Sequence, residues 1–462
     1  MRSAVLALLL AGCATVGPDY QRPEIPLPAQ YPASEAPGAE IAPDWWRLFN
    51  DPLLDKLVAA ARESNADMRL AAARVQEAEA LVREARGAFF PDVVGGYTAT
   101  RNRVSTRTEP PPAATADLVR SQHQLLASTS FELDFWGRFA RASEAAQANL
   151  LASELSRETV ALTLAGATAQ AYFALRSLDA QVEVLENTIR LRRDSLAIAR
   201  ARADAGLASE LDVHQAQGAL SDALVQQREA RRNRSLVERQ LAQLSGNLPL
   251  KVAAGDLFAL PVPPTPPPGL PSSLLERRPD IRAAEQNLVA ANAQIGVARA
   301  ALFPAISLTA ALGAQSAEFS TLLSSGAGIW SLGFGLALPL FDGGRRSARV
   351  DQAAARREQF VASYQRSIET GFREVADALE NVEQSLGAER ELQARLEAAR
   401  NALELSRIRY ESGYSPYLEV LDAQRTANEA ELAFVRNRQA RLAFSIDLVK
   451  ALGGGWSSAR RD

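Results

Sequence analysis

Side chains that could carry out covalent or metal chemistry are scarce in this sequence. The 462 residues include two histidines and one cysteine, too few for the usual zinc, haem or iron–sulfur sites, so a metal could be held only by carboxylates. No nucleotide-binding loop, G-x-S-x-G or H-E-x-x-H motif occurs. We therefore expect no catalytic residues, no metal site and no enzyme activity.

The balance of charge excludes a nucleic-acid-binding protein. Acidic side chains number 54 and basic ones 51, and the pI is about 5.8, whereas proteins that bind nucleic acid carry a basic domain or a basic face. With 47% hydrophobic residues, the chain has ample material for a large core.

The cysteine, Cys13, is the clearest candidate for chemistry. A basic start and a short apolar stretch precede it, as in secretory signals, and no second cysteine is present for a disulfide within the chain. Leu10-Ala11-Gly12-Cys13 resembles the lipobox of bacterial lipoproteins, which implies a covalent lipid on Cys13 as the only cofactor; a buried thiol is the alternative. The following Ala14 implies the Gram-negative outer membrane, because lipoprotein sorting typically reserves Asp there for the inner membrane.

The two halves of the chain repeat one pattern. The segment from Asn65 to Pro91 recurs as Arg278 to Pro304, and Leu133 to Arg138 recurs as Leu340 to Arg345. The domains that we predict are a signal peptide (1–12), a lipidated N-terminus with an extended Pro-rich tether (13–44), a first structural repeat (45–247) with a strand hairpin (92–135) and a coiled-coil hairpin (138–246), a Pro-rich linker or insertion (248–272), a second repeat (273–453) with a strand hairpin (305–341) and a coiled-coil hairpin (344–453), and a C-terminal tail (454–462).

Each repeat changes from a helical to a strand-like hydrophobic period and back. Apolar and polar side chains alternate from His123 to Leu133, and large apolar residues from Trp330 to Leu340 alternate with small ones such as Gly333 and Gly335. Strands of about ten residues suit a tilted crossing of a bilayer. Two transmembrane strands per repeat are predicted; packing in a soluble core is the alternative. The aromatic residues that we expect at the membrane interface are Phe135, Trp136 and Trp330.

Two very long helices are predicted, each followed by a second helix. The stretches 138–205 and 344–412 contain almost nothing that interrupts a helix, and at 1.5 Å per residue each would be roughly 100 Å long. Gly206 and Gly413 end them and can take the left-handed conformation of a helix C-cap. Ser209 and Ser415 are the expected N-caps of the following helices.

Open strand edges cannot remain in lipid, so the four strands must pair with strands of other copies. Two chains would give eight strands and a filled bore, and three would give twelve and an open lumen. Small residues on one strand face favour the lumen. The expected fold class is mainly α with a membrane β-barrel: a long antiparallel coiled-coil helical tube plus four transmembrane strands per protomer, closing a 12-stranded barrel in a homotrimer.

These features together resemble the outer membrane factor family, in the OprM-type, NodT-like lipoprotein branch of the TolC superfamily. The resemblance is carried by the lipobox, the duplication, the two Phe-Pro junctions and the segments 133–137, 339–344, 417–425 and 450–456. It implies a trimeric export channel that receives substrates from an inner-membrane pump, most often of the resistance-nodulation-division (RND) type, through a periplasmic adaptor protein.

The resemblance also implies a gate that opens by an iris-like movement of the inner coiled coils at the periplasmic end. The positions that match the family's gate are Tyr410, Leu418, Glu419 and Asp422. Three copies of each carboxylate near one axis would repel one another, attract cations and raise one another's pKa. Alternatively, the two acids only favour the positive end of a helix dipole.

The latch and the adaptor contacts follow from the same resemblance. Ser415 stands where some relatives carry a latching arginine, so we expect Arg407 or Arg409 to serve instead. The tip residues that would meet the adaptor are Gly206, Leu207, Gly413, Tyr414 and Tyr417. Of these, the side chains of Leu207, Tyr414 and Tyr417 either anchor the adaptor or pack the turns.

A structural coiled-coil lipoprotein, acting as a periplasmic spacer without a pore, is the rival hypothesis. It accounts for the long helices. It does not account for amphipathic strands at matching positions in both repeats.

Overall fold

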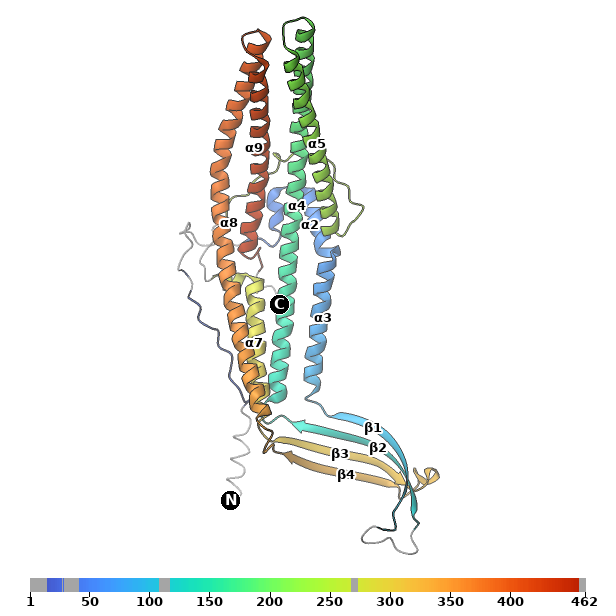
Figure 1. Ribbon diagram of the computed structural model, residues 1–462. Helices are drawn as coiled ribbons and strands as arrows, with labels where there is room; N and C mark the ends of the chain where they lie inside the picture. The colour runs from blue at the N-terminus through green and yellow to red at the C-terminus, as the bar shows by residue number, and fades with distance from the viewer. Residues whose placement is uncertain (1–14, 27, 29–40, 108–116, 267–272, 457–462) are drawn as a thin grey trace. The chain divides into compact units, whose positions relative to one another are not determined.

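The computed structural model describes residues 15–26, 28, 41–107, 117–266 and 273–456 (Figure 1). The predicted signal peptide, Cys13 and part of the tether lie outside these residues. The described chain is mainly helical with one small antiparallel sheet. In this part of the chain, no helix is both long and apolar enough to cross a bilayer.

The helices form two series of matching lengths. The first series comprises η1 (Trp45–Phe49), α2 (Pro52–Ser64), α3 (Ala66–Gly87), α4 (Arg138–Asp204) and α5 (Glu210–Leu244), and the second comprises α6 (Leu274–Arg277), α7 (Pro279–Ala300), α8 (Arg345–Glu411) and α9 (Tyr417–Ala451). Helices α3 and α7 have 22 residues each, α4 and α8 have 67, and α5 and α9 have 35. The second half of the chain thus repeats the helical plan of the first.

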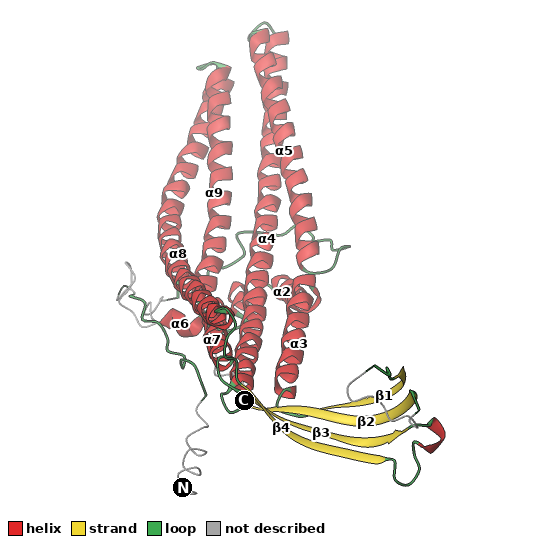
Figure 2. Ribbon diagram, turned by 60° about the horizontal axis from the view of Figure 1, so that its bottom comes forward, coloured by secondary structure: helices red, strands yellow, loops and turns green. Residues whose placement is uncertain are grey.

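The four expected strands are present and form one sheet. They are β1 (Asp92–Arg103), β2 (Val119–Leu133), β3 (Ala305–Ser316) and β4 (Gly328–Ala337), with a short helix, η3 (Phe319–Thr321), between the last two. Neighbours in the order β1-β2-β3-β4 pair antiparallel, so one hairpin from each repeat lies in the same sheet (Figure 2). Strands β1 and β4 are its two edges.

Contacts divide the chain into two compact units that cut across the sequence repeats. Unit 1 contains Gln76–Ala152, Ala284–Ser363 and the described part of Met1–Glu24, and therefore holds the sheet and the helix ends next to it in sequence. Unit 2 contains Ile25–Val75, Ser153–Ala283 and Tyr364–Asp462. Each unit combines segments of both repeats, so packing joins the two repeats rather than separating them.

Unit 2 has an aromatic core. Trp45, Phe49, Tyr172 and Phe173 are buried together, and the Phe49 and Phe173 rings meet edge to face with centroids 4.7 Å apart. The Tyr172 hydroxyl donates to Asp51, whose other carboxylate oxygen caps α2 by accepting from the Leu53 amide at 2.8 Å. The apolar core and the start of α2 therefore depend on the same contacts.

The long helices end as predicted. Gly206 and Gly413 have φ angles of 73° and 79°, and the next residue's amide donates five residues back, at 2.8 Å in both turns. Ser209 caps α5 by accepting from the Leu211 amide at 3.1 Å. The N-cap predicted at Ser415 is wrong, because Pro416 is the extended residue before α9 and no side chain caps that helix.

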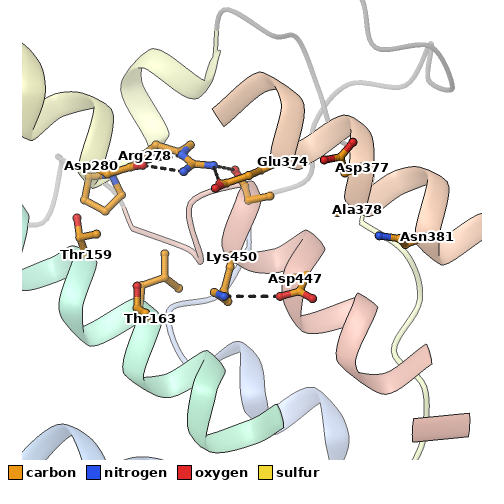
Figure 3. A pocket seen from close by; sticks show the side chains of 13 residues that line it. Thr159, Thr163, Arg278, Asp280, Glu374, Asp377, Ala378, Asn381, Asp447 and Lys450 are labelled. Carbon is orange, nitrogen blue, oxygen red and sulfur yellow. Dashed lines mark hydrogen bonds and ion pairs between the residues drawn. The ribbon is translucent and has the colours of Figure 1, made fainter. Parts of the chain in front are cut away.

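The start of each 22-residue helix is tied to the end of the returning helix of its own repeat. In the first repeat, Asn65 Nδ2 donates to the Leu244 carbonyl at 2.9 Å, and in the second, Arg278 Nη1 donates to the Ala451 carbonyl at 3.2 Å. Arg278 also pairs with Asp280 at 2.6 Å and with Glu374 at 2.7 Å (Figure 3). Its side chain is only 8% exposed, so this guanidinium joins α7, α8 and α9 from inside unit 2.

We expect Arg278→Ala and Asn65→Ala each to destabilise unit 2. Removing Arg278 leaves two carboxylates without their cation, at a cost on the order of 2 kcal/mol; the cost stays below that of a fully buried pair because Asp280 and Glu374 are partly exposed. Losing the Asn65 side chain removes two neutral hydrogen bonds, one to the Leu244 carbonyl and one from the Asp67 amide at 2.7 Å that caps α3, at a cost of about 2 kcal/mol in total. Thermal unfolding followed by circular dichroism measures both. The exposed pair of Arg373 and Asp377 provides the control, and an Arg373→Ala midpoint as low as that of Arg278→Ala would contradict the prediction.

Candidate channel elements and gate

The sheet presents one large apolar face. Its register places Leu308 between Phe131 and Phe334, and Leu312 between Ala127 and Trp330. On β4 the large side chains are strongly exposed: Trp330 79%, Leu332 75%, Phe334 67% and Leu336 61%. An exposed apolar surface of this kind marks contact with lipid or with another protein.

The opposite face is small and polar. A Cβ atom added to Gly333 would lie 2.7 Å from Thr309 Oγ1, and one added to Gly335 would lie 2.9 Å from Ser307 Oγ. The two glycines therefore leave room for hydroxyl groups on the neighbouring strand. Such a face suits contact with water better than contact with lipid.

The predicted interface aromatics differ in environment. Trp330 is exposed near the start of β4. Trp136 and Phe135 follow the end of β2 and are half-buried; Trp136 stacks on Phe303 at 4.7 Å and its Nε1 donates to the Pro304 carbonyl at 2.8 Å. Trp136 is therefore also a structural contact between the two repeats, which its sequence position did not reveal.

Three of the four predicted gate residues are exposed at the start of α9. The Leu418 side chain is 59% exposed. Glu419 Oε1 accepts from Arg409 at 3.0 Å across the turn, and Asp422 Oδ1 accepts from Arg425 at 2.8 Å on α9 itself. All four charged side chains are at least 41% exposed, so both acids can meet other charges.

The fourth gate residue, Tyr410, is buried. It packs edge to face against Tyr417 with ring centroids 5.4 Å apart, and both rings belong to a cluster with Ile189 and Leu196 of α4 and Leu220 of α5. Within one protomer, these tyrosines hold the α8–α9 hairpin to the α4–α5 hairpin. The reason is size and apolarity: the aromatic rings fill the space between four helix ends.

The Tyr417 side chain, predicted as a tip residue, is 1% exposed. Of the alternatives considered for the tips, Tyr417 packs the turn. Leu207 and Tyr414, by contrast, are 71% and 81% exposed, beside Gly206 and Gly413. They remain the candidate contacts with a partner.

The arginine that joins the two hairpins is Arg202, which the sequence analysis missed. Its Nη1 donates to the Tyr410 carbonyl at 2.8 Å and its guanidinium lies 4.8 Å from the centre of the Tyr410 ring. Arg409 instead binds Glu419 within its own hairpin, and Arg407 binds Glu411 on α8. The position of Arg202 in the last turn of α4, where helix dipoles favour cations, was the available signal.

The described part of the tether runs extended along unit 1. Asp19 pairs with Arg141 of α4 at 2.7 Å, and Arg22 pairs with Glu285 of α7 at 2.6 Å. The Val16 amide also donates to the Trp136 carbonyl at 3.0 Å. The segment therefore fastens helices from both repeats, in agreement with an extended tether along a surface.

Comparison with known proteins identifies the family. The model of the family described as "Outer membrane efflux protein" matches residues 57–247 and 270–454. The chain belongs to this family. It is 37% identical to the solvent efflux pump outer membrane protein SrpC of Pseudomonas putida, over 97% of each protein, and 37% identical to the outer membrane protein OprJ of Pseudomonas aeruginosa, over 99% of this chain and 96% of that protein. The solved structure of the outer-membrane channel OprN superposes with a TM-score of 0.89 at 30% identity, covering 96% of this chain and 100% of that one.

Membership of the outer membrane efflux protein family gives the general function. The protein is an outer membrane factor of the TolC superfamily, located in the outer membrane of a Gram-negative cell. It is an export channel and not an enzyme. The exposed sheet faces and helix tips are the parts of the structure that are available for contact with the membrane, water or partner proteins.

We expect the contact between the hairpins to weaken between pH about 10 and 12. Burial raises the pKa of Tyr417 to about 12, and it also raises the pKa of Tyr410. A raised tyrosine pKa means that the stabilisation is complete below the unfolded value of about 10 and is lost as the pH rises through the folded value. At 1.36 kcal/mol per unit, Tyr417 accounts for about 2 kcal/mol of this loss.

The Tyr417→Phe variant tests this, because it keeps the ring and removes the ionising hydroxyl. Its thermal unfolding midpoint should fall less than that of the unaltered protein over this pH range. Tyr414→Phe is the control, since Tyr414 is exposed. If Tyr417→Phe and the unaltered protein lose the same stability, Tyr417 is not the group that titrates.

Proposed function

We propose that this efflux channel works as a homotrimer whose three sheets close a 12-stranded barrel. The observation that supports this most strongly is the sheet itself: its apolar face is exposed and its edges, β1 and β4, have no partner strand among the described residues. Backbone groups in hydrocarbon must be hydrogen-bonded, so β4 of one copy has to pair with β1 of the next. Twelve strands leave an open bore, whereas eight are filled by side chains.

In this arrangement the apolar face meets lipid and the small polar face lines the lumen. Small side chains keep this lining from filling the bore, and hydroxyl groups let it bind water. The residues are Gly333, Gly335, Ser307 and Thr309. Trp330 and Trp136 then lie near the two ends of the barrel, where aromatic residues favour the interface between lipid and water. A wide aqueous channel of this kind leaves the choice of substrate to the pump.

The lipid anchor and the partners complete the proposal. Cys13 carries the covalent lipid, and the described tether that follows it runs along unit 1 through its contacts with Arg141 and Glu285. A periplasmic adaptor protein contacts the helical tips at Leu207 and Tyr414, whose exposed apolar side chains suit burial in a protein interface. An inner-membrane RND transporter delivers the substrate.

The gate is formed by the start of α9. Three copies of Leu418, Glu419 and Asp422 near one axis close the channel, and their carboxylates attract cations. Opening moves each α8–α9 hairpin away from its α4–α5 hairpin. Within a protomer this movement must separate Arg202 from Tyr410 and expose the tyrosine pair.

The test of the proposed function combines two measurements on one sample of purified, lipidated protein. Its mass in detergent and its single-channel conductance in a planar bilayer should show a trimer with a small conductance that prefers cations. A protein that is soluble and monomeric after removal of the lipid would support the coiled-coil spacer instead. A trimer without conductance is examined again with the gate variant below, and continued silence there would count against a channel.

The gate variant combines Glu419→Ala with Asp422→Ala. It removes the carboxylates from the constriction, so the preference for cations should fall and the conductance should change. If the rings contribute about 1 kcal/mol to cation binding, the effect on selectivity is about fivefold.

The matched control is Glu404→Ala, which removes an exposed carboxylate from α8 ahead of the turn. It should leave conductance and selectivity unchanged. Unaltered conductance and selectivity in the double variant would show that these acids serve only the start of α9.

A further inference from the structure

The most exposed large apolar side chains of unit 1 lie where the chain leaves β4. Leu340 is 87% and Phe341 is 93% exposed, just ahead of α8. At the other edge of the sheet, Phe90 is 72% exposed just before β1, whereas its neighbour Phe89 packs edge to face on Phe139. Large apolar side chains are thus exposed beside both edges of one sheet, at the same end of its strands.

The first repeat contains the corresponding junction, where the chain leaves β2 for α4. There the aromatic side chain is packed against the other repeat. At the end of β2, Trp136 stacks on Phe303 and its Nε1 donates to the Pro304 carbonyl. Behind this contact, Ala145 and Ala148 of α4 pack on Ala290 and Ala293 of α7. The end of a second strand of one repeat is thus joined to the Phe-Pro start of a strand in the other repeat.

The sequence repeat shows which residues correspond. Phe90-Pro91 matches Phe303-Pro304, and the segment after β4 matches the segment after β2. This alignment pairs Asp134 with Phe341 and places Asp342 one position later, yet each aspartate accepts hydrogen bonds from backbone amides near the start of its long helix. Gly343 stands in place of Trp136, and the aromatic ring of the second repeat is Phe341, ahead of the aspartate.

The exposed segment after β4 and the exposed segment before β1 lie at the same end of the sheet. The end of β4 pairs with the start of β3 through Ala337 and Ala305, and the start of β1 pairs with β2 through Asp92 and Ser130. When β4 of one copy pairs antiparallel with β1 of the next, the segment after β4 must meet the segment before β1. The occupant of this surface is therefore a second copy of the chain.

Opposite charges lie on the two segments of the open junction, Arg345 after β4 and Asp92 at the start of β1. In the filled junction, Arg138 binds Glu132 with two hydrogen bonds, at 3.1 and 2.7 Å. The second repeat has Arg345 in place of Arg138 but Pro339 in place of Glu132. The missing carboxylate is present elsewhere: Asp92 replaces Ala305, which lines the same hollow as Glu132 and Arg138. Neither Arg345 nor Asp92 makes an ion pair within the described residues.

We propose that Phe90 and Asp92 of one copy bind Phe341 and Arg345 of the neighbouring copy. The proposal rests on the trimeric channel proposed above and adds the residues that join its subunits at the base of the barrel. The aromatic contact repeats between chains the one that Trp136 and Phe303 make within a chain, whereas the ion pair, which the first repeat forms inside one segment, here crosses between the chains. Contact with the neighbouring copy covers the rings of Phe90 and Phe341. It also gives Arg345 the carboxylate partner that its own repeat lacks.

Cysteine cross-linking of the full-length, lipidated protein tests the contact. A variant with Phe90→Cys and Phe341→Cys should form covalent dimers and trimers on oxidation, seen on a denaturing gel without reductant, while each single variant stays monomeric. The control pairs Phe90→Cys with Leu323→Cys, because Leu323 is equally exposed at 83% but follows the far end of β3. That pair should give no cross-link.

The outcomes separate the contact from the oligomer. A protein with the mass of a trimer in detergent but no cross-link between positions 90 and 341 overturns the contact and leaves the proposed channel standing. A monomeric mass for the unaltered protein overturns the proposed trimer itself. Cross-linking of the control pair to the same extent also overturns the contact, because random collision then suffices.

A charge exchange tests the ion pair independently of cysteine chemistry. Asp92→Arg and Arg345→Asp should each reduce the fraction of trimer that survives mild heating in detergent, and the double exchange should restore it. A merely structural effect of either residue would not be rescued by the other. A double variant no more stable than the weaker single variant overturns the ion pair.

Discussion

Backbone hydrogen bonding at the edges of the sheet is the constraint on which the rest of this structure depends. A four-stranded sheet with a largely apolar, exposed face has two edges without a partner strand among the described residues, and neither edge can face hydrocarbon. In the proposed channel, the chain completes its sheet with other copies of itself. This requirement makes the proposed channel a property of the assembly, since one chain alone encloses no lumen.

Duplication gives the chain a way to meet that requirement. Two repeats of the same plan place one strand hairpin each in a single sheet. In the proposed trimer, a contact that joins the repeats within a chain has a counterpart between chains. The junction of Trp136 with Phe303 shows the inner version. Differences between the repeats, such as Gly343 in place of Trp136 and Pro339 in place of Glu132, then mark where the outer version must be built from other residues.

At the helical tips, packing and charge serve different purposes. The Tyr410–Tyr417 pair and Arg202 join the two hairpins near the tips, and Ser195 with Gln424 and Thr188 with Asn428 add hydrogen bonds between α4 and α9 farther along. Glu419 and Asp422 remain exposed and paired only with surface arginines, contacts that are weak in water. Buried contacts thus hold the hairpins to each other, whereas the exposed acids are free to meet other charges.

The sequence by itself determined the features that depend on local pattern. Periodicity located the strands and the long helices, and the repeat showed that both halves follow one plan. Gly206 and Gly413 marked the turns, because glycine readily takes the left-handed conformation that ends each long helix. Family motifs then gave membership and the general role. These signals work because a period, a cap or a glycine acts over a few residues.

Only the tertiary structure decided which side chains are covered. Tyr417 is one residue from exposed Leu418, yet it is buried because four helix ends converge on its ring. Arg202, and not Arg407 or Arg409, joins the hairpins, since the partner of a long charged side chain depends on which helix lies opposite. Burial and pairing are set by segments that are 200 residues apart in the chain and adjacent only after folding, as for Arg202 and Tyr410, separated by 208 positions.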